Sequence, residues 1–164
     1  MKKITVLLTK YSDWVSSFLY HAVGHSYTHA SLGLEEEPGV YYSFNYKGFC
    51  VETLEKHRRR GVEKSMLCEV EISDEAYWRM KKQLLQFKEH RMELRYTRVG
   101  VVFCLLHLPF RWKGHYFCSQ FVVEMLQNSG AVPMKKPAVL YLPNQIFSEL
   151  IQNDRVFRIQ ENPV

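Results

Sequence analysis

Apolar and polar side chains alternate in several short stretches of the chain, and this period of two predicts β-strands. Residues 4–9 (ITVLLT) form a short, β-rich run. Residues 27–46 contain one alternating run and one aromatic-rich run joined by a turn with Pro and Gly, which predicts a β-hairpin. Residues 64–72 alternate again, and residues 155–159 (RVFRI) predict a closing strand.

Elsewhere, apolar residues recur every three or four positions, which predicts amphipathic helices. Ser73 is a typical N-cap residue, and Asp74 and Glu75 follow it where the helix dipole favours acidic side chains. Because strands and helices are both predicted and no linker or repeat separates them, we expect a single α+β domain over residues 1–164. The predicted helices cover residues 11–24, 74–91, part of 99–108, 118–130 and 143–150.

The composition is that of a folded domain with an ordinary core. Of the 164 residues, 46% are hydrophobic and 24% are charged, as in typical globular proteins. The net charge of +5 favours anionic partners only weakly. The densest basic cluster, residues 55–64 (EKHRRRGVEK), lacks interleaved aromatics, so we expect a solvated loop and no nucleic-acid partner. The alternative is a nucleic-acid or anionic-surface binder that uses Arg58, Arg59 and Arg60.

No stretch of the sequence predicts a transmembrane segment. The N-terminal apolar run ends at Thr9 and Lys10, which makes it shorter than the hydrophobic region of a signal peptide. The longest later apolar run, residues 99–110 (VGVVFCLLHLPF), contains His107 and Pro109 and is too short to cross a bilayer. We therefore expect a cytoplasmic protein.

The cysteines and histidines do not have the spacing of a metal site. His21, His25 and His29 are four residues apart, but Gly24 interrupts the predicted helix and His29 already belongs to a strand pattern. The cysteines contain no C-x-x-C pair, so zinc is not expected and free thiols are predicted. We expect neither a metal nor another cofactor. The four cysteines are Cys50, Cys68, Cys104 and Cys118.

Cys118 differs from the other cysteines because it stands where a helical pattern begins, in the stretch YFCSQFVVEML. Unpaired backbone N–H groups and the helix dipole at such a position stabilise a thiolate. The backbone N–H groups of Cys118 and Ser119 are candidates for an oxyanion hole. A nucleophilic cysteine also needs a base, and His29 on the polar face of its predicted strand is the candidate. The alternative is that Cys118 only packs in the core.

Two blocks of sequence, THASLGLEEEPGVYYSF and FCSQFVVEML, resemble the circularly permuted NlpC-type, papain-like cysteine hydrolases. This superfamily includes the lecithin retinol acyltransferase-like enzymes. In its permuted members the histidine strand precedes the cysteine helix, as it does here. The resemblance implies a papain-like fold, in which a small antiparallel sheet packs against the cysteine helix, with Cys118 as nucleophile and His29 as base.

The resemblance also implies a third residue, on the strand after His29, that orients the imidazole. Direct alignment of the strand motifs places this residue at Tyr42. Strand alternation instead assigns Tyr42 to the core and leaves Ser43 on the polar face with His29, so Ser43 is the preferred candidate.

These features together predict a cysteine-dependent hydrolase or acyltransferase. Cys118 would attack an amide, thioester or ester carbonyl and form an acyl-enzyme, with His29 as base. The expected substrate is a small molecule, a peptide or peptidoglycan fragment, or a lipid or protein acyl group. The alternative is a non-catalytic binding module on a degenerate papain-like scaffold.

Overall fold

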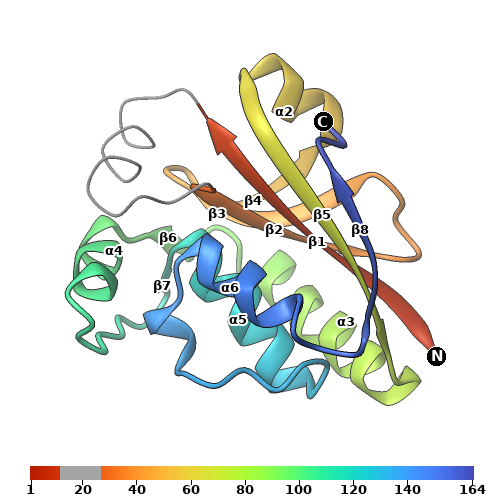
Figure 1. The fold of residues 1–164 in the computed structure, drawn as a ribbon. Coiled ribbons are helices and arrows are strands. Elements are labelled where there is room, and N and C mark those ends of the chain that lie inside the picture. Colours follow the sequence, from red (N-terminus) through yellow and green to blue (C-terminus); the bar gives the residue numbers. More distant parts are fainter. Residues whose placement is uncertain (12–26) are drawn as a thin grey trace.

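The computed structural model describes residues 1–11 and 27–164 (Figure 1). The helix predicted over residues 11–24 lies outside these residues, and so do His21 and His25. Among the described residues, no helix is long and apolar enough to cross a membrane.

A six-stranded sheet with the strand order β4-β3-β2-β1-β5-β8 forms the centre of the fold, and all of its strand pairs are antiparallel. The expected α+β class is confirmed. The hairpin predicted over residues 27–46 is present as β2 and β3, because its alternating residues give each strand one core face. The strands are β1 (Lys2–Tyr11), β2 (His29–Leu34), β3 (Val40–Asn45), β4 (Gly48–Thr53), β5 (Val62–Ile72) and β8 (Val156–Glu161).

Helices cover the sheet, and α3, α5 and α6 lie together on one side of it (Figure 1). The predicted N-cap at Ser73 is confirmed, since its hydroxyl accepts a hydrogen bond from the Ala76 N–H at 3.1 Å. The helix predicted from Cys118 ends as expected at Gly130, whose φ of 74° suits a glycine. The helices are α2 (Leu54–Arg59), α3 (Asp74–Glu89), α4 (Arg98–Leu105), α5 (Cys118–Ser129), the 3-10 turn η1 (Ala138–Leu140) and α6 (Pro143–Leu150).

The region between residues 46 and 64 differs from its prediction. Tyr46 and Lys47 form a tight turn, and Gly48 then begins β4, which pairs along the whole of β3. The prediction of a solvated loop over residues 55–64 is wrong, because its first part is helix α2 and its last part begins β5. His57 of α2 is completely buried, so this basic segment has an inner face.

The two faces of the sheet carry different residues. The main core lies between the sheet and α3 and α5, and it includes Tyr42 and Phe44 of β3. On the other face, Tyr41 packs with Leu7 and Leu67. Because strand partners in register share a face, Glu52 of β4, the partner of Tyr41, belongs to this second face.

Helix α5 is held in the main core by aromatic side chains. Phe121 is completely buried, and its ring lies 5.0–5.8 Å from those of Phe44, Phe49 and Phe87. Tyr116 adds ring contacts to Phe44 and Phe87 just before the helix begins. These contacts fix the N-terminus of α5, and therefore Cys118, relative to β2 and β3.

We expect Phe121→Ala to lower the free energy of unfolding by about 3–5 kcal/mol, because it leaves a cavity at the centre of this cluster. The matched change Phe157→Ala, at a β8 position that is 44% exposed, should cost less than about 1 kcal/mol. Urea unfolding followed by circular dichroism measures both. Equal losses in the two variants would show that the cluster does not anchor α5.

Candidate active site

Cys118 is the first residue of α5, and its side chain is buried. Phe117 precedes it in an extended conformation and provides no side-chain cap. The backbone N–H groups of Ser119 and Ala30 lie near the Cys118 sulfur and lower the pKa of its thiol. One donor belongs to the helix N-terminus and the other to β2, so the sulfur sits at the junction of the two elements.

The beginning of β2 brings His29 to the same point. Farther along this strand, Leu32 and Gly33 pair with β3, whereas the Ala30 N–H is directed to the sulfur of Cys118. The side chain of His29 belongs to the face of the sheet opposite the main core, but at the end of the strand it still reaches the N-terminus of α5. The sequence-predicted nucleophile and base therefore lie next to each other.

The His29 imidazole bridges the cysteine and a carboxylate. Its Nε2 lies 2.8 Å from Oε2 of Glu52, and the ring lies close enough to the thiol of Cys118 for each group to shift the pKa of the other. Because Nε2 is engaged by Glu52, Nδ1 is the ring nitrogen that remains for the sulfur. Cys118, His29 and Glu52 thus form a buried chain in which each group has a hydrogen-bond partner.

This arrangement favours an ion pair between the cysteine and the histidine. Burial opposes protonation of His29, but the charges of Glu52 and Cys118 outweigh burial and raise the pKa of His29 to about 10. Burial likewise opposes ionisation of Cys118, but the hydrogen bond and charge of His29, with the Ala30 and Ser119 N–H groups, lower its pKa below the usual thiol value. A thiolate next to an imidazolium is the nucleophilic form of a cysteine.

Glu52 is ionised although it is nearly inaccessible to solvent. Burial alone would raise the pKa of this carboxyl, but His29, His57 and Arg60 lower it to about 2. Arg60 approaches Oε1 at 3.3 Å, while His57 Nε2 lies 3.6 Å from Oε2. The carboxylate is therefore held by groups from β2, α2 and the residue that follows α2.

His57 acts as a neutral neighbour of this carboxylate. Burial lowers the pKa of His57 to about 4, against the opposing effect of Glu52. Its Nδ1 is hydrogen-bonded to the hydroxyl of Tyr11, and a hydroxyl that donates to Nδ1 leaves Nε2–H facing Glu52. The guanidinium of Arg60 lies over the Tyr11 ring, 4.4 Å from its centroid. Tyr11 thus holds both groups that flank Glu52 on its α2 side.

Ser43, the predicted orienting residue, does not contact His29. Its hydroxyl donates to the Ala30 carbonyl at 2.6 Å, so it supports the strand instead of the imidazole. Tyr42, the residue given by direct alignment, is part of the main core, and its hydroxyl donates to Glu37. The side chain that contacts the second nitrogen of His29 is therefore Glu52 and not the predicted Ser43, and it carries the charge that a serine lacks.

The N-terminus of α5 also provides donors for an oxyanion. The first intrahelical bond is made by the Phe121 N–H to the Phe117 carbonyl, so the N–H groups of Cys118, Ser119 and Gln120 come before the first turn closes. The predicted oxyanion-hole groups of Cys118 and Ser119 are in this set. Among the described residues, the buried Ser119 hydroxyl has no hydrogen-bond partner.

The other three cysteines have the opposite electrostatics. Burial raises the pKa of Cys68 and of Cys104 to about 11. Burial also raises the pKa of Cys50, and the nearby charge of Glu52 raises it further. Cys118 is therefore the one cysteine of the four whose surroundings favour a thiolate.

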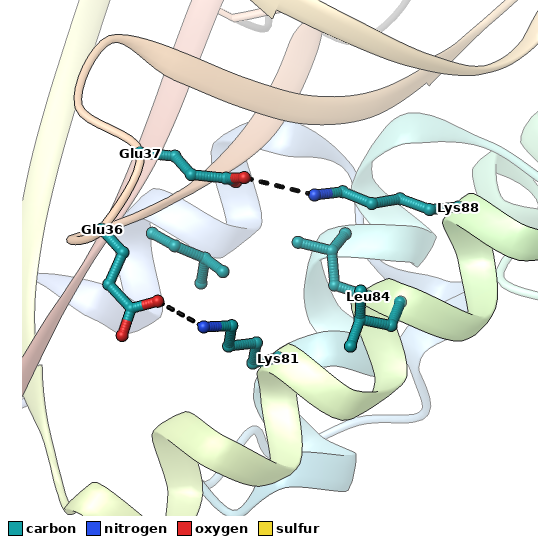
Figure 2. A pocket seen from close by; sticks show the side chains of 7 residues that line it. Glu36, Glu37, Lys81, Leu84 and Lys88 are labelled. Atoms are coloured by element: carbon teal, nitrogen blue, oxygen red, sulfur yellow. Dashed lines mark hydrogen bonds and ion pairs between the residues drawn. The ribbon is translucent and has the colours of Figure 1, made fainter.

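A separate hollow of about 310 Å³ lies between the β2–β3 turn and α3 (Figure 2). Two ion pairs cross it, Glu36 with Lys81 and Glu37 with Lys88, so its charges are already neutralised in pairs. It shares no residue with the Cys118 site, and we do not assign it a ligand. Its lining residues are Leu34, Glu36, Glu37, Lys81, Leu84, Leu85 and Lys88.

The sequence did contain signals for Glu52 and His57. Residues 48–53 (GFCVET) form an apolar-rich run after a short turn that ends in glycine, and Thr53 is a good N-cap residue for a following helix. A strand here would have placed Glu52 beside the hairpin that carries His29. Tyr11 gave no comparable signal, because only tertiary packing brings it to His57.

Within residues 1–11 and 27–164, no group of three or more His, Cys, Asp or Glu side chains is arranged to hold a metal ion. Cys118, His29 and Glu52 lie next to one another in this part of the structure. No protein-family model matches this chain, and no curated protein matches it significantly, so this geometry is the basis for any functional conclusion.

Proposed function

We propose that this protein is a cysteine-dependent hydrolase or acyltransferase that acts on an amide, thioester or ester. The observation that carries the proposal is the buried chain Cys118–His29–Glu52, in which the pKa of the thiol is lowered and that of the imidazole is raised. Pairs of groups whose surroundings shift their pKa values in this way are characteristic of catalytic sites.

The mechanism follows from the positions of these groups. The Cys118 thiolate attacks the substrate carbonyl, and the backbone N–H groups at the start of α5 bind the oxyanion that forms. The His29 imidazolium then donates its proton to the leaving group, which yields the acyl-enzyme. Water or a second nucleophile, deprotonated by His29, releases the acyl group. Glu52 stabilises the imidazolium and keeps Nδ1 directed at the sulfur.

The resemblance to permuted papain-like hydrolases supports this proposal. It assigns the nucleophile to Cys118 and the base to His29, and these side chains are in contact. An antiparallel sheet packs against the cysteine helix, as that family would require. The substrate classes that fit this chemistry are peptides, peptidoglycan fragments, and lipid or protein acyl groups. The four free cysteines fit a reducing compartment such as the cytoplasm.

The two alternatives have lost their main support. The binding-module hypothesis rested on a weak third residue, and Glu52 supplies a charged one. Two of the three arginines that an anionic-surface binder would use are paired, Arg59 with Glu55 and Arg60 with Glu52.

Iodoacetamide should alkylate Cys118 before the other cysteines near neutral pH, because only its surroundings favour the thiolate. Peptide mapping by mass spectrometry at short reaction times measures the order. Cys68 and Cys104 serve as internal controls and should react only after unfolding. If Cys50 or Cys104 is labelled ahead of Cys118, the nucleophile is misassigned.

The pH dependence of this alkylation tests the ion pair. The rate should begin to rise at a pH below the ordinary thiol pKa of about 8.5, because the imidazolium of His29, whose pKa is raised to about 10, stabilises the thiolate. Glu52→Gln removes the charge that stabilises the imidazolium, so the pKa of His29 falls and that of Cys118 rises. The rise in rate should then move to higher pH. An identical profile in the two proteins would mean that Glu52 does not support the pair.

Turnover of a model thioester or ester should depend on all three groups. Cys118→Ala and His29→Ala should abolish it, and Glu52→Gln should slow it by about 10²- to 10⁴-fold. Ser43→Ala should reduce kcat less than tenfold, since Ser43 does not touch the imidazole. Thermal unfolding of each variant separates loss of chemistry from loss of fold. Full activity in a folded Glu52→Gln protein would contradict the assigned role of Glu52.

A further inference from the structure

Helix α4 and the loop that follows it carry large apolar side chains on their outer surface. Val99 and Val102 of α4 are exposed, and Leu106, just after the helix, is 61% exposed. Leu108 and Trp112 continue the exposed series through the loop. A helix at the surface of a globular protein normally presents polar residues to water, so this face is unusual.

The inner side of α4 packs against the rest of the domain. Cys104 is buried against Phe117 and Leu142, and Gly100 fits closely against Thr97 and Phe117. The helix is therefore apolar on both sides, and its inner contacts fix its orientation. Within residues 1–11 and 27–164, the outer residues of α4 belong to none of the buried clusters.

The segment is presented as a firm protrusion and not as a loose loop. β6 (Arg95–Tyr96) and β7 (His115–Tyr116) pair with each other and close its base. At the end of α4, the N–H groups of His107 and Leu108 bond to the carbonyls of Cys104 and Phe103, and His107 has a φ of 57°. This is the Schellman pattern of a well-terminated helix. We call residues 98–113 the α4 protrusion, and it lies at one end of the molecule, away from β5 and β8 (Figure 1).

The charged side chains within the α4 protrusion itself are all basic. No Asp or Glu occurs between Glu93 and Glu124 in the sequence. Among the basic side chains here, Arg111 also pairs with the buried Glu124. A row of cations beside exposed apolar residues complements a surface that is apolar inside and anionic outside. The exposed basic residues of this region are Arg95, Arg98, Arg111 and Lys113.

Trp112 adds a feature that is typical of a membrane interface. Its indole is half-exposed and stacks on the ring of His115, with the centroids 3.9 Å apart. Tryptophan is enriched where hydrocarbon meets lipid headgroups, because it combines an apolar body with one N–H donor. Here it lies between the two basic residues Arg111 and Lys113.

We propose that the α4 protrusion docks the protein peripherally on an anionic lipid bilayer. Val102, Leu106, Leu108 and Trp112 enter the boundary between headgroups and acyl chains, and the basic residues contact lipid phosphates and carboxylates. An α-helix of eight residues is only about 12 Å long, much shorter than the ~30 Å hydrocarbon core, so the contact is interfacial.

Charge argues for lipid over a second copy of the chain. In a symmetric dimer through this surface, each copy would bring the same set of arginines and lysine to the interface, and like charges would face each other. Lipid headgroups supply the opposite charge instead. The inference does not depend on the proposed catalysis, although Phe117, which packs under α4, directly precedes Cys118.

Co-sedimentation of the full chain with vesicles tests the proposal. The protein should bind vesicles of phosphatidylcholine and phosphatidylserine, and bind vesicles of phosphatidylcholine alone much more weakly. Leu106→Glu should weaken binding tenfold or more, because it removes an inserted apolar side chain and adds a repelled charge. Leu85→Glu is the matched control on α3, where the leucine is 48% exposed, and it should bind like the unmodified protein.

Two further measurements test whether the α4 protrusion is the part of the protein that contacts the vesicle. Replacing Arg98 and Lys113 by Ser should weaken binding by about fivefold for each charge removed, and added salt should have the same direction of effect. Tryptophan fluorescence should shift to shorter wavelength on binding, and Trp112→Phe should remove this shift while Trp78→Phe retains it. Cys118→Ala should bind vesicles normally, which separates this inference from the proposed chemistry.

Three results would overturn the proposal. The first is no binding to the anionic vesicles. The second is an equal effect of Leu106→Glu and Leu85→Glu on vesicle binding. The third is a protein that sediments as a dimer and becomes a monomer in Leu106→Glu without binding vesicles, which would assign the α4 protrusion to a second copy.

Discussion

The candidate site depends on the ion pair between the buried carboxylate of Glu52 and the imidazole of His29. A carboxylate at 3% exposure is strongly destabilised unless cations and donors replace its lost hydration. His29 and Arg60 provide that replacement, and the Nε2 of His57 lies 3.6 Å from Oε2. Because the charge of Glu52 is fixed, His29 holds its proton, and because His29 is charged, Cys118 can exist as a thiolate. The charge of the Cys118 sulfur is thus set by Glu52, which acts on it through His29.

The candidate site joins residues from the two faces of the sheet. Cys118 comes from the helix that packs on the main core face, whereas Glu52 and His57 belong to the opposite face. The two sides communicate where β2 begins and the Ala30 N–H points to the sulfur. The aromatic cluster around Phe121 then keeps α5 in register with that strand end. Packing in the core and ionisation at the site are therefore consequences of one arrangement.

Much of the fold was predictable because its signals are local. The hairpin of β2 and β3, the N-cap at Ser73 and the termination of α5 at Gly130 follow from alternation, capping chemistry and positive φ. The proximity of Cys118 and His29 was also expected, from a helix start, a strand face and the resemblance to permuted papain-like hydrolases. Alternation also assigned Ser43 and Tyr42 to the correct faces of the sheet. It could not supply the third residue, because β4 had not been predicted and charged residues near Arg58 were interpreted as solvated. Burial of Glu52 and His57 depends on partners from separate elements, which local patterns do not record.

The position of β4 at an edge of the sheet determines how local opening of this edge would affect Cys118. β4 is one of the two edge strands of the sheet, whereas Cys118 and His29 belong to α5 and an inner strand. Edge elements open locally at a lower free energy than the whole domain. If β4 and α2 separate from the sheet, Glu52 moves away from His29. The pKa of His29 then falls, and its proton passes to the sulfur of Cys118 while the rest of the core is still folded. The ionisation of the Cys118 thiol therefore depends on the pairing of β4 with β3.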